Sequence, residues 1–275
     1  MKTPRMIMMV AVVTTGLFFE NTAAFAQTRV KQLALEAHDG NRITGFILQD
    51  ADAAKDAPLA ILMHGMTGSS LQWLAKDNVT AGDAVSGDLV KRGYRVVALD
   101  ARSHGVRKDN MPPIQRLEKL RAGQSEAYLA MINGTMGDYD VLLEDVKRQF
   151  GQPKSILVLG YSMGAQMAVL FAAKHGEVGH IVTMVPPAAT DVPSVAPVTH
   201  AHKVQANWLL LTASRDQFST RADSDALVKA AGNKMHRVEY DSPHMLPQSY
   251  VDKVIDWIAN IRTEIATDKT IGSGR

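Results

Sequence analysis

The sequence predicts an α/β protein whose mostly parallel sheet has about eight strands and helices on both faces. Short apolar runs alternate with longer amphipathic segments, which is typical of βαβ units. Several of the runs are apolar throughout, as expected of strands that are covered on both faces. A glycine follows four of the amphipathic segments, where helix ends favour a left-handed residue: Gly93, Gly151, Gly176 and Gly232.

The first two expected strands form a hairpin. Residues 31–37 and 42–49 flank His38-Asp39-Gly40-Asn41, in which Asp and Gly tolerate the positive φ angles of a tight turn. Apolar character and length predict six further strands, at 59–63, 95–99, 155–159, 180–185, 208–212 and 235–240. The helical period predicts helices at 83–92, 138–150, 163–175, 221–231 and 250–265.

The chain has 275 residues, and no repeat, low-complexity tract or long linker divides it. We therefore expect a single domain over residues 27–275. Two segments, 103–137 and 186–205, do not follow the alternation of short apolar runs with amphipathic segments. Long excursions from a compact domain often cover a site, so 103–137 is a candidate lid-like insertion, with surface decoration as the alternative.

Composition excludes several classes of protein. A formal net charge of +2 without blocks of like charge argues against nucleic-acid binding. The absence of cysteine excludes disulfides, thiolate metal sites and cysteine nucleophiles. We find no P-loop and no dinucleotide-binding glycine motif, and His200 and His202 lack a cluster of further metal ligands. No cofactor and no metal ion are therefore expected.

The N-terminus has the pattern of an export signal. Lys2 and Arg5 precede the apolar residues 6–19, and Ala24-Phe25-Ala26 supplies the small residues of a cleavage site after Ala26. The apolar run is shorter than the roughly 20 residues that span a bilayer, although an N-terminal anchor is the alternative. We expect residues 1–26 to be a signal peptide and the mature protein to be periplasmic or secreted, without a membrane span.

The strongest chemical motif is Gly160-Tyr161-Ser162-Met163-Gly164. It follows an apolar run and precedes a helical segment, which is the strand-turn-helix context of a nucleophile elbow. The small residues on both sides allow a sharp turn that exposes the Ser162 hydroxyl at a helix N-terminus. Ser162 is therefore the candidate nucleophile, and a helix cap is the structural alternative.

A serine nucleophile needs a base and a group that orients the base. Asp216 and His244 each follow an expected strand, and the carboxyl ends of parallel strands gather at one edge of a sheet. Asp216 is favoured as the acid because it lies directly between a strand and a helix. Asp191 is the alternative acid, whereas Asp241 is expected to shape a turn.

With this order of nucleophile, acid and base, the sequence resembles the α/β-hydrolase superfamily, in particular serine carboxylesterases and monoacylglycerol-lipase-like enzymes. The stretches 64–69 and 100–105 look like the family's oxyanion loop and the loop after its fourth strand. The resemblance implies an α/β-hydrolase fold in which only the second strand is antiparallel. Residues 186–205 are too few for the large cap that many members carry.

Acyl transfer places negative charge on the substrate's carbonyl oxygen, which two fixed backbone N–H groups can stabilise. The resemblance assigns these donors to Met66 and Met163, and His64 is expected to be structural. We expect cleavage of a small-molecule carboxylic ester through an acyl-enzyme, with a Ser162, His244 and Asp216 triad. A thioesterase, acyltransferase or peptidase would use the same residues, and a silent binding protein of this fold is the remaining alternative.

Overall fold

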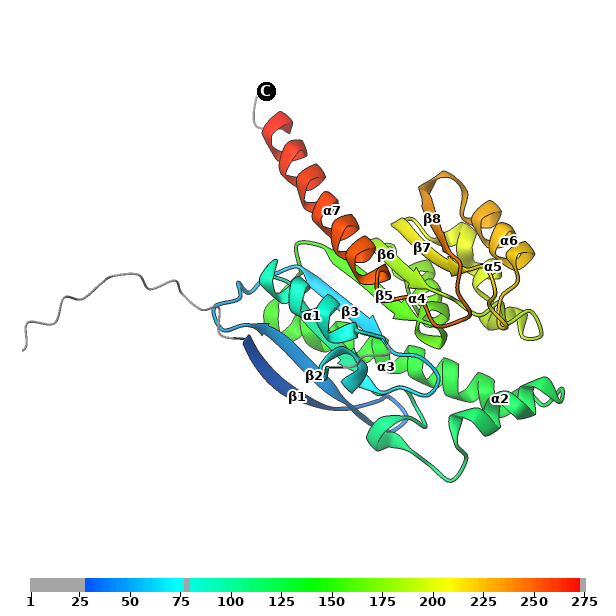
Figure 1. Ribbon diagram of the computed structural model, residues 1–275. Coiled ribbons are helices and arrows are strands. Elements are labelled where there is room, and N and C mark those ends of the chain that lie inside the picture. The colour runs from blue at the N-terminus through cyan, green and yellow to red at the C-terminus, as the bar shows by residue number, and fades with distance from the viewer. Residues whose placement is uncertain (1–27, 77–79, 273–275) are drawn as a thin grey trace, which may run out of the picture.

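A computed structural model describes residues 28–76 and 80–272 of the chain (Figure 1). The predicted signal peptide, residues 1–26, lies outside them. The sheet consists of β1 (Thr28–Glu36), β2 (Arg42–Asp50), β3 (Leu59–Met63), β4 (Arg95–Leu99), β5 (Ile156–Tyr161), β6 (Val178–Met184), β7 (Asn207–Ala213) and β8 (Met235–Tyr240). All eight coincide with the expected strands to within a few residues.

The strands lie in the order β1-β2-β4-β3-β5-β6-β7-β8. β2 pairs antiparallel with both β1 and β4, and all other pairs are parallel. Only β2 therefore runs against the other strands, as the family resemblance implied. The fold is that of an α/β hydrolase, and the carboxyl ends of β3 to β8 lie along one edge.

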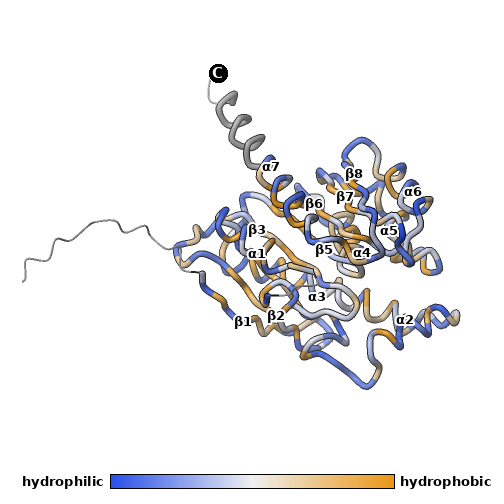
Figure 2. The backbone as a smooth tube through the Cα atoms, viewed as in Figure 1, coloured by the Kyte–Doolittle hydropathy of each residue, from blue (hydrophilic) through white to orange (hydrophobic). Residues whose placement is uncertain are grey.

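Helices cover both faces of the sheet (Figure 1). They are α1 (Gly82–Lys91), α2 (Pro113–Arg121), α3 (Glu126–Phe150), α4 (Met163–Lys174), α5 (Pro197–His200), α6 (Arg221–Ala231) and α7 (Tyr250–Gly272). One core cluster joins the sheet to α3, α4 and α6, and the other joins it to α1 and α7. Figure 2 shows hydrophobic residues along the central strands and hydrophilic residues in the outer turns.

The central strands supply side chains to both clusters because successive residues of a strand point to opposite faces. In β3, Leu59, Ile61 and Met63 belong to the cluster with α3, whereas Ala60 and Leu62 belong to the cluster with α1. Every residue of β3 is fully buried. The continuous apolar run in the sequence thus reflects a strand buried on both faces.

Residues 103–137 are more regular than the sequence analysis indicated. They contain a short 3₁₀ helix at Gly105–Arg107, all of α2, and the first turns of α3, which begins at Glu126 rather than near Asp138. A Cβ atom at Gly134 would come within 2.5 Å of the Arg102 side chain. Glycine at this position of α3 therefore leaves room for Arg102. Residues 186–205 hold only short helical turns, and no large cap is present in the described fold.

None of the helices within 28–76 and 80–272 has the length and apolar character that crossing a membrane requires.

Candidate active site

Ser162 occupies a strained turn between β5 and α4. Its φ and ψ angles are 55° and −119°, a conformation that residues with a side chain rarely adopt. The Ser162 N–H donates to the Met184 carbonyl at 2.8 Å, and the Ser162 carbonyl accepts from the N–H groups of Ala165 and Gln166. These bonds to β6 and to the first turn of α4 hold the turn, so the motif found in the sequence forms a nucleophile elbow.

The two glycines of the motif are required by close backbone packing. A Cβ atom on Gly160 would lie 2.1 Å from the carbonyl oxygen of Gly164, and one on Gly164 would lie 2.0 Å from that of Met63. Real Cβ atoms do not approach backbone oxygens so closely. The elbow therefore packs against β3 only because neither residue has a side chain.

We predict that Gly164→Ala destabilises the protein by more than about 4 kcal/mol, because the methyl group meets backbone that cannot move aside. The free energy of unfolding in urea measures this loss. Gly87→Ala is the matched control, since Gly87 lies in α1 with no atom within 4 Å of the added Cβ. It should be neutral or slightly stabilising. Equal stability of the two variants would contradict this account of the elbow.

The structure brings Ser162, His244 and Asp216 into one hydrogen-bonded line. His244 Nε2 lies 2.8 Å from Ser162 Oγ, and His244 Nδ1 lies 2.9 Å from both carboxylate oxygens of Asp216. The Asp216 side chain is only 2% exposed and also accepts the Phe218 N–H at 2.8 Å. With Nδ1–H donating to the carboxylate, His244 Nε2 is the nitrogen that accepts from the serine hydroxyl.

Aromatic rings fix the imidazole from two sides. Phe218 packs against His244 at 4.6 Å between ring centroids, and Tyr161 lies edge-on at 6.5 Å. The Tyr161 hydroxyl donates to the His244 carbonyl at 3.3 Å and accepts the Leu246 N–H at 2.9 Å. Burial raises the pKa of Tyr161 to about 12, so its hydroxyl keeps the proton that it donates.

The other acids and histidines weighed from the sequence lie elsewhere. Asp191 is exposed in the turn that follows β6. Asp241 accepts from the Ser214 hydroxyl and pairs with Arg215, in agreement with the expected turn role. His200 contacts the Ser194 carbonyl through Nε2 at 2.9 Å. Within the described residues, no group of three or more His, Asp or Glu side chains is arranged to hold a metal ion.

The loop after β3 places Met66 on the wall of the cavity that Ser162 lines. His64 Nε2 accepts the Ala101 N–H at 3.0 Å, so His64 Nδ1 carries the proton and donates to the Gly65 carbonyl at 2.8 Å. The Gly68 N–H also donates to that carbonyl, at 3.0 Å. In a trans peptide the N–H points opposite to the C=O, so holding the Gly65 carbonyl fixes the direction of the Met66 N–H.

Two side chains that sequence reasoning did not assign to this loop hold its neighbouring peptides. Gln72 Oε1 accepts the Gly65 N–H at 3.2 Å, and His104 Nε2 contacts the Met66 carbonyl. No pattern in the sequence indicates Gln72, because it follows the loop in a short 3₁₀ helix. Met163, the first residue of α4, has no carbonyl within the helix to accept its N–H. Met66, Met163 and Ser162 line one cavity.

His64 makes the stability of the protein dependent on pH. Burial, and to a smaller extent the nearby His104, lowers the pKa of His64 from 6.5 to about 4. Below pH 6.5 the unfolded chain binds a proton at His64 that the folded chain excludes until about pH 4. The free energy of unfolding should therefore fall by up to about 3 kcal/mol between these pH values.

Urea denaturation at pH 7 and pH 4.5 measures this fall. His64→Gln should show a smaller fall over the same interval, since glutamine does not titrate. His38→Gln is the control, because His38 is exposed in the β1–β2 turn, and its pH dependence should match that of the wild type. An identical fall in His64→Gln and wild type would assign the effect to another group.

Ser162 and His244 line a cavity of about 600 Å³. Its walls combine the loop after β3 with Leu71, Phe218 and Met245, and the segment 103–137 adds Ile114, Leu117 and Tyr128. Tyr128 donates to Gln166 Oε1 at 2.6 Å, and burial raises its pKa to about 12. The cavity that Ser162 lines thus has a largely apolar wall, and part of that wall comes from α2.

Comparison with known proteins defines the class. The family model of the alpha/beta hydrolase fold matches residues 58–253, more than half of the chain, and the chain belongs to this family. No curated protein sequence matches it. Among solved structures, the Pyrococcus furiosus esterase Pf2001 is similar, with a TM-score of 0.64, 17% identity, and coverage of 84% of this chain and 92% of the esterase.

A cold-adapted esterase from an Arctic intertidal metagenomic library is similar to the same extent. Its TM-score is 0.65 at 18% identity, with coverage of 84% of this chain and 93% of that one. Identities this low establish a shared fold. The chain is therefore an α/β hydrolase whose structural neighbours include esterases.

Proposed function

We propose that this protein hydrolyses carboxylic esters through an acyl-enzyme. The observation that carries the proposal is the hydrogen-bonded line from Asp216 through His244 to Ser162 at the mouth of an apolar cavity. Three elements far apart in the sequence supply these side chains. A serine held in a strained turn beside an oriented imidazole is the arrangement that activates a hydroxyl.

In the first half of the reaction, Ser162 Oγ attacks the ester carbonyl carbon while its proton passes to His244 Nε2. Asp216 stabilises the resulting imidazolium and keeps its Nδ1–H oriented. The N–H groups of Met66 and Met163 receive the negative charge that develops on the carbonyl oxygen. His244 then protonates the leaving alcohol, and the ester bond breaks.

In the second half, water replaces the alcohol. His244 removes a proton from the water, whose oxygen attacks the acyl carbon; the bond to Ser162 Oγ then breaks, His244 returns the proton to Oγ, and the carboxylic acid is released. No step needs a cofactor, because the residues of the site supply the nucleophile, the base and the charge stabilisation. Esters are favoured over amides by the esterases among the structural neighbours and by the apolar wall of the cavity.

Covalent labelling tests the proposal. A fluorophosphonate probe should label the wild type at Ser162, as mapped by peptide mass spectrometry, and Ser162→Ala should remain unlabelled. A panel of p-nitrophenyl esters, matched thioesters and anilides then ranks the substrate classes. Absence of labelling would favour the alternative of a silent binding protein, and labelling with a preference for thioesters or anilides would replace the ester assignment.

We further propose that segment 103–137 covers the site and sets the acyl chain length. Leu117 of α2 lines the cavity and packs on the main core. Leu117→Ala should lower kcat/KM for long acyl chains by about fourfold per lost methylene contact, and leave acetyl esters nearly unchanged. Glu118→Ala is the matched control, because Glu118 is exposed on the same helix outside the cavity. An unchanged chain-length profile in Leu117→Ala would rule out this role.

A further inference from the structure

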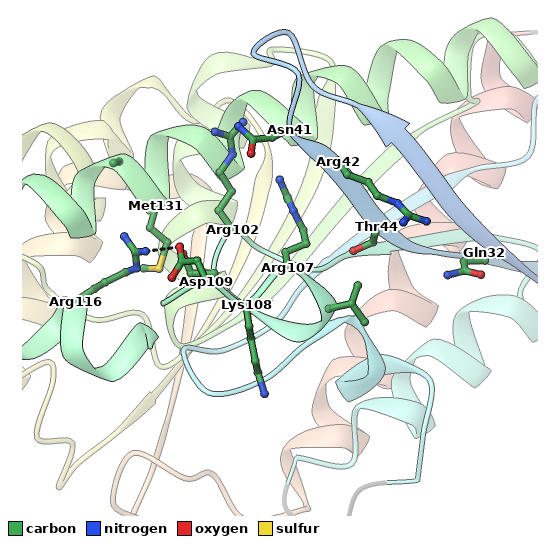
Figure 3. A pocket seen from close by; sticks show the side chains of 13 residues that line it. Gln32, Asn41, Arg42, Thr44, Arg102, Arg107, Lys108, Asp109, Arg116 and Met131 are labelled. Atoms are coloured by element: carbon green, nitrogen blue, oxygen red, sulfur yellow. Dashed lines mark hydrogen bonds and ion pairs between the residues drawn. The ribbon is translucent and has the colours of Figure 1, made fainter. Parts of the chain in front are cut away.

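A second cavity, of about 620 Å³, lies between the β1–β2 hairpin and segment 103–137 (Figure 3). Its lining is rich in cations and holds one carboxylate: Arg42, Arg102, Arg107, Lys108, Arg116 and Asp109. Lys108 also lines the catalytic cavity, so one residue belongs to the walls of both. Neither the proposed reaction nor the comparisons assign a role to this cavity.

Two of the arginines use all three of their guanidinium nitrogens in hydrogen bonds within the protein. Arg102 uses Nε and Nη2 to bind the carboxylate of Asp138 side-on, and Nη1 and Nη2 to bind Asp39. Arg116 donates to Asp109 and to the carbonyl groups of Met111 and Ala127, which uses all three of its nitrogens. These guanidinium groups build the walls and have little left to offer a ligand.

Arg107 is different. Its side chain is only 7% exposed, and Nη1 alone makes its protein contacts, at 3.0 Å to the Asp100 carbonyl and 2.7 Å to Asp138. Its Nε and Nη2 have no hydrogen-bond partner among the described residues. In Arg102 the equivalent two nitrogens, Nε and Nη2, bind the Asp138 carboxylate side-on. A buried guanidinium therefore lines the cavity with its two-donor fork open.

The charge balance of the cavity also favours an anion. Arg102 and Arg107 are balanced by Asp39 and Asp138, and Arg116 is balanced by Asp109. Asp100 adds a negative charge beneath Thr44, where its oxygens accept from Thr44, Ser70 and Val106.

Arg42 and Lys108 then remain as cations without an ion-pair partner in the described part of the chain, which leaves an excess of positive charge. In Figure 3, Arg107 extends between Arg102 and the β2 side chains, and Lys108 extends in the opposite direction.

We propose that this cavity binds a carboxylate or phosphate group. The Nε and Nη2 groups of Arg107 donate side-on to two oxygens of the group, and Arg42 supplies further positive charge from the hairpin wall. Lys108 lines both cavities, so the two are neighbours, and a substrate that carries such a group at a distance from its ester is one candidate source of the anion. A free anion has the same chemistry, and the experiments below distinguish the two sources.

Isothermal titration calorimetry with inorganic phosphate and with glutarate, at ionic strength matched by sodium chloride, tests the site directly. Two charge-assisted hydrogen bonds predict a Kd of about 1 mM or tighter for the wild type. Arg107→Lys keeps a cation for Asp138 but lacks the fork, and should weaken binding by about tenfold or more. Arg42→Gln, an exposed position whose replacement leaves the fold intact, should weaken it too.

Arg29→Gln is the matched control, because Arg29 is an exposed arginine of the same hairpin outside the cavity, and it should bind as the wild type does. The proposal is overturned if neither anion binds the wild type saturably. It is also overturned if Arg107→Lys and Arg42→Gln both bind as tightly as Arg29→Gln.

A pair of substrates identifies the source of the anion. The kcat/KM of the mono-p-nitrophenyl ester of adipate is compared with that of p-nitrophenyl hexanoate, which has the same acyl length without the charge. A preference for the adipate ester that Arg42→Gln reduces and Arg29→Gln retains supports a substrate group in the site. Saturable binding without such a preference supports a free anion.

Calorimetry with Ser162→Ala separates this inference from the proposed function. The variant should bind phosphate as the wild type does, because Ser162 lies outside the second cavity. Phosphate binding without ester hydrolysis would support the anion site and overturn the proposed function. Ester hydrolysis without phosphate binding would support the proposed function and overturn the anion site.

Discussion

Replacement of Ser162 by alanine should lower kcat/KM for p-nitrophenyl esters by at least about 10⁴-fold. In the proposed mechanism the hydroxyl, at the end of the line from Asp216 and His244, forms the bond to the acyl carbon. Alanine fits the elbow, since the backbone hydrogen bonds of residue 162 do not involve the side chain. The thermal unfolding midpoint and the far-UV circular dichroism should therefore match those of the wild type.

Ser242→Ala is the control for this experiment. Ser242 is also buried, two residues before His244, and its hydroxyl has no hydrogen-bond partner within the described residues. Loss of that hydroxyl should leave turnover at the wild-type level. Wild-type turnover in Ser162→Ala would make the proposed mechanism untenable, whereas loss in both variants would indicate a structural effect on the loop.

Replacement of Asp216 by asparagine should lower kcat by about 10³ to 10⁴-fold with little change in KM. Both oxygens of Asp216 lie 2.9 Å from His244 Nδ1. Asparagine replaces one of these acceptors with an NH₂ donor and removes the charge that stabilises the imidazolium. The imidazole then favours the tautomer that carries its proton on Nε2, and this tautomer cannot accept the serine proton.

Asp191→Asn is the control, because Asp191 is the acid that the sequence left as an alternative and is exposed after β6. It should retain full activity. The acid assignment would be wrong if Asp191→Asn were inactive and Asp216→Asn were not. Steady-state kinetics on one ester, with a folding check by circular dichroism, decides between the two outcomes.

Local sequence was sufficient for most of the sheet. All five residues of β3 are apolar and buried on both faces, so the run itself identifies the strand. The turn at Ser162 was also recognisable locally, because the Gly164 carbonyl within the same five-residue motif requires glycine at 160, although the Met63 carbonyl of β3 requires glycine at 164. The positions of Asp216 and His244 after their strands also placed them at the correct edge of the sheet.

The start of α3 was not predictable in this way. Its first turns contain Gly134 and Gly137, which lower helix propensity, and the helix is stabilised there by burial of Met131, Ile132 and Thr135 against the rest of the protein. Tertiary packing thus overrides a weak local preference. The sequence analysis did not predict α2 either, and Leu120 is the one buried residue of that helix.

The sequence by itself determined the strands along the chain, the turn that carries Ser162, and Ser162 and His244 as members of the hydrogen-bonded line. Only the tertiary structure showed that Gln72 holds the loop after β3, that Asp216 rather than Asp191 lies beside His244, and that Arg107 has an open edge in a second cavity. The physical reason is the range of the interactions. Turns and strands depend on neighbours in the chain, whereas hydrogen-bond partners and cavity walls come from segments that only folding brings together.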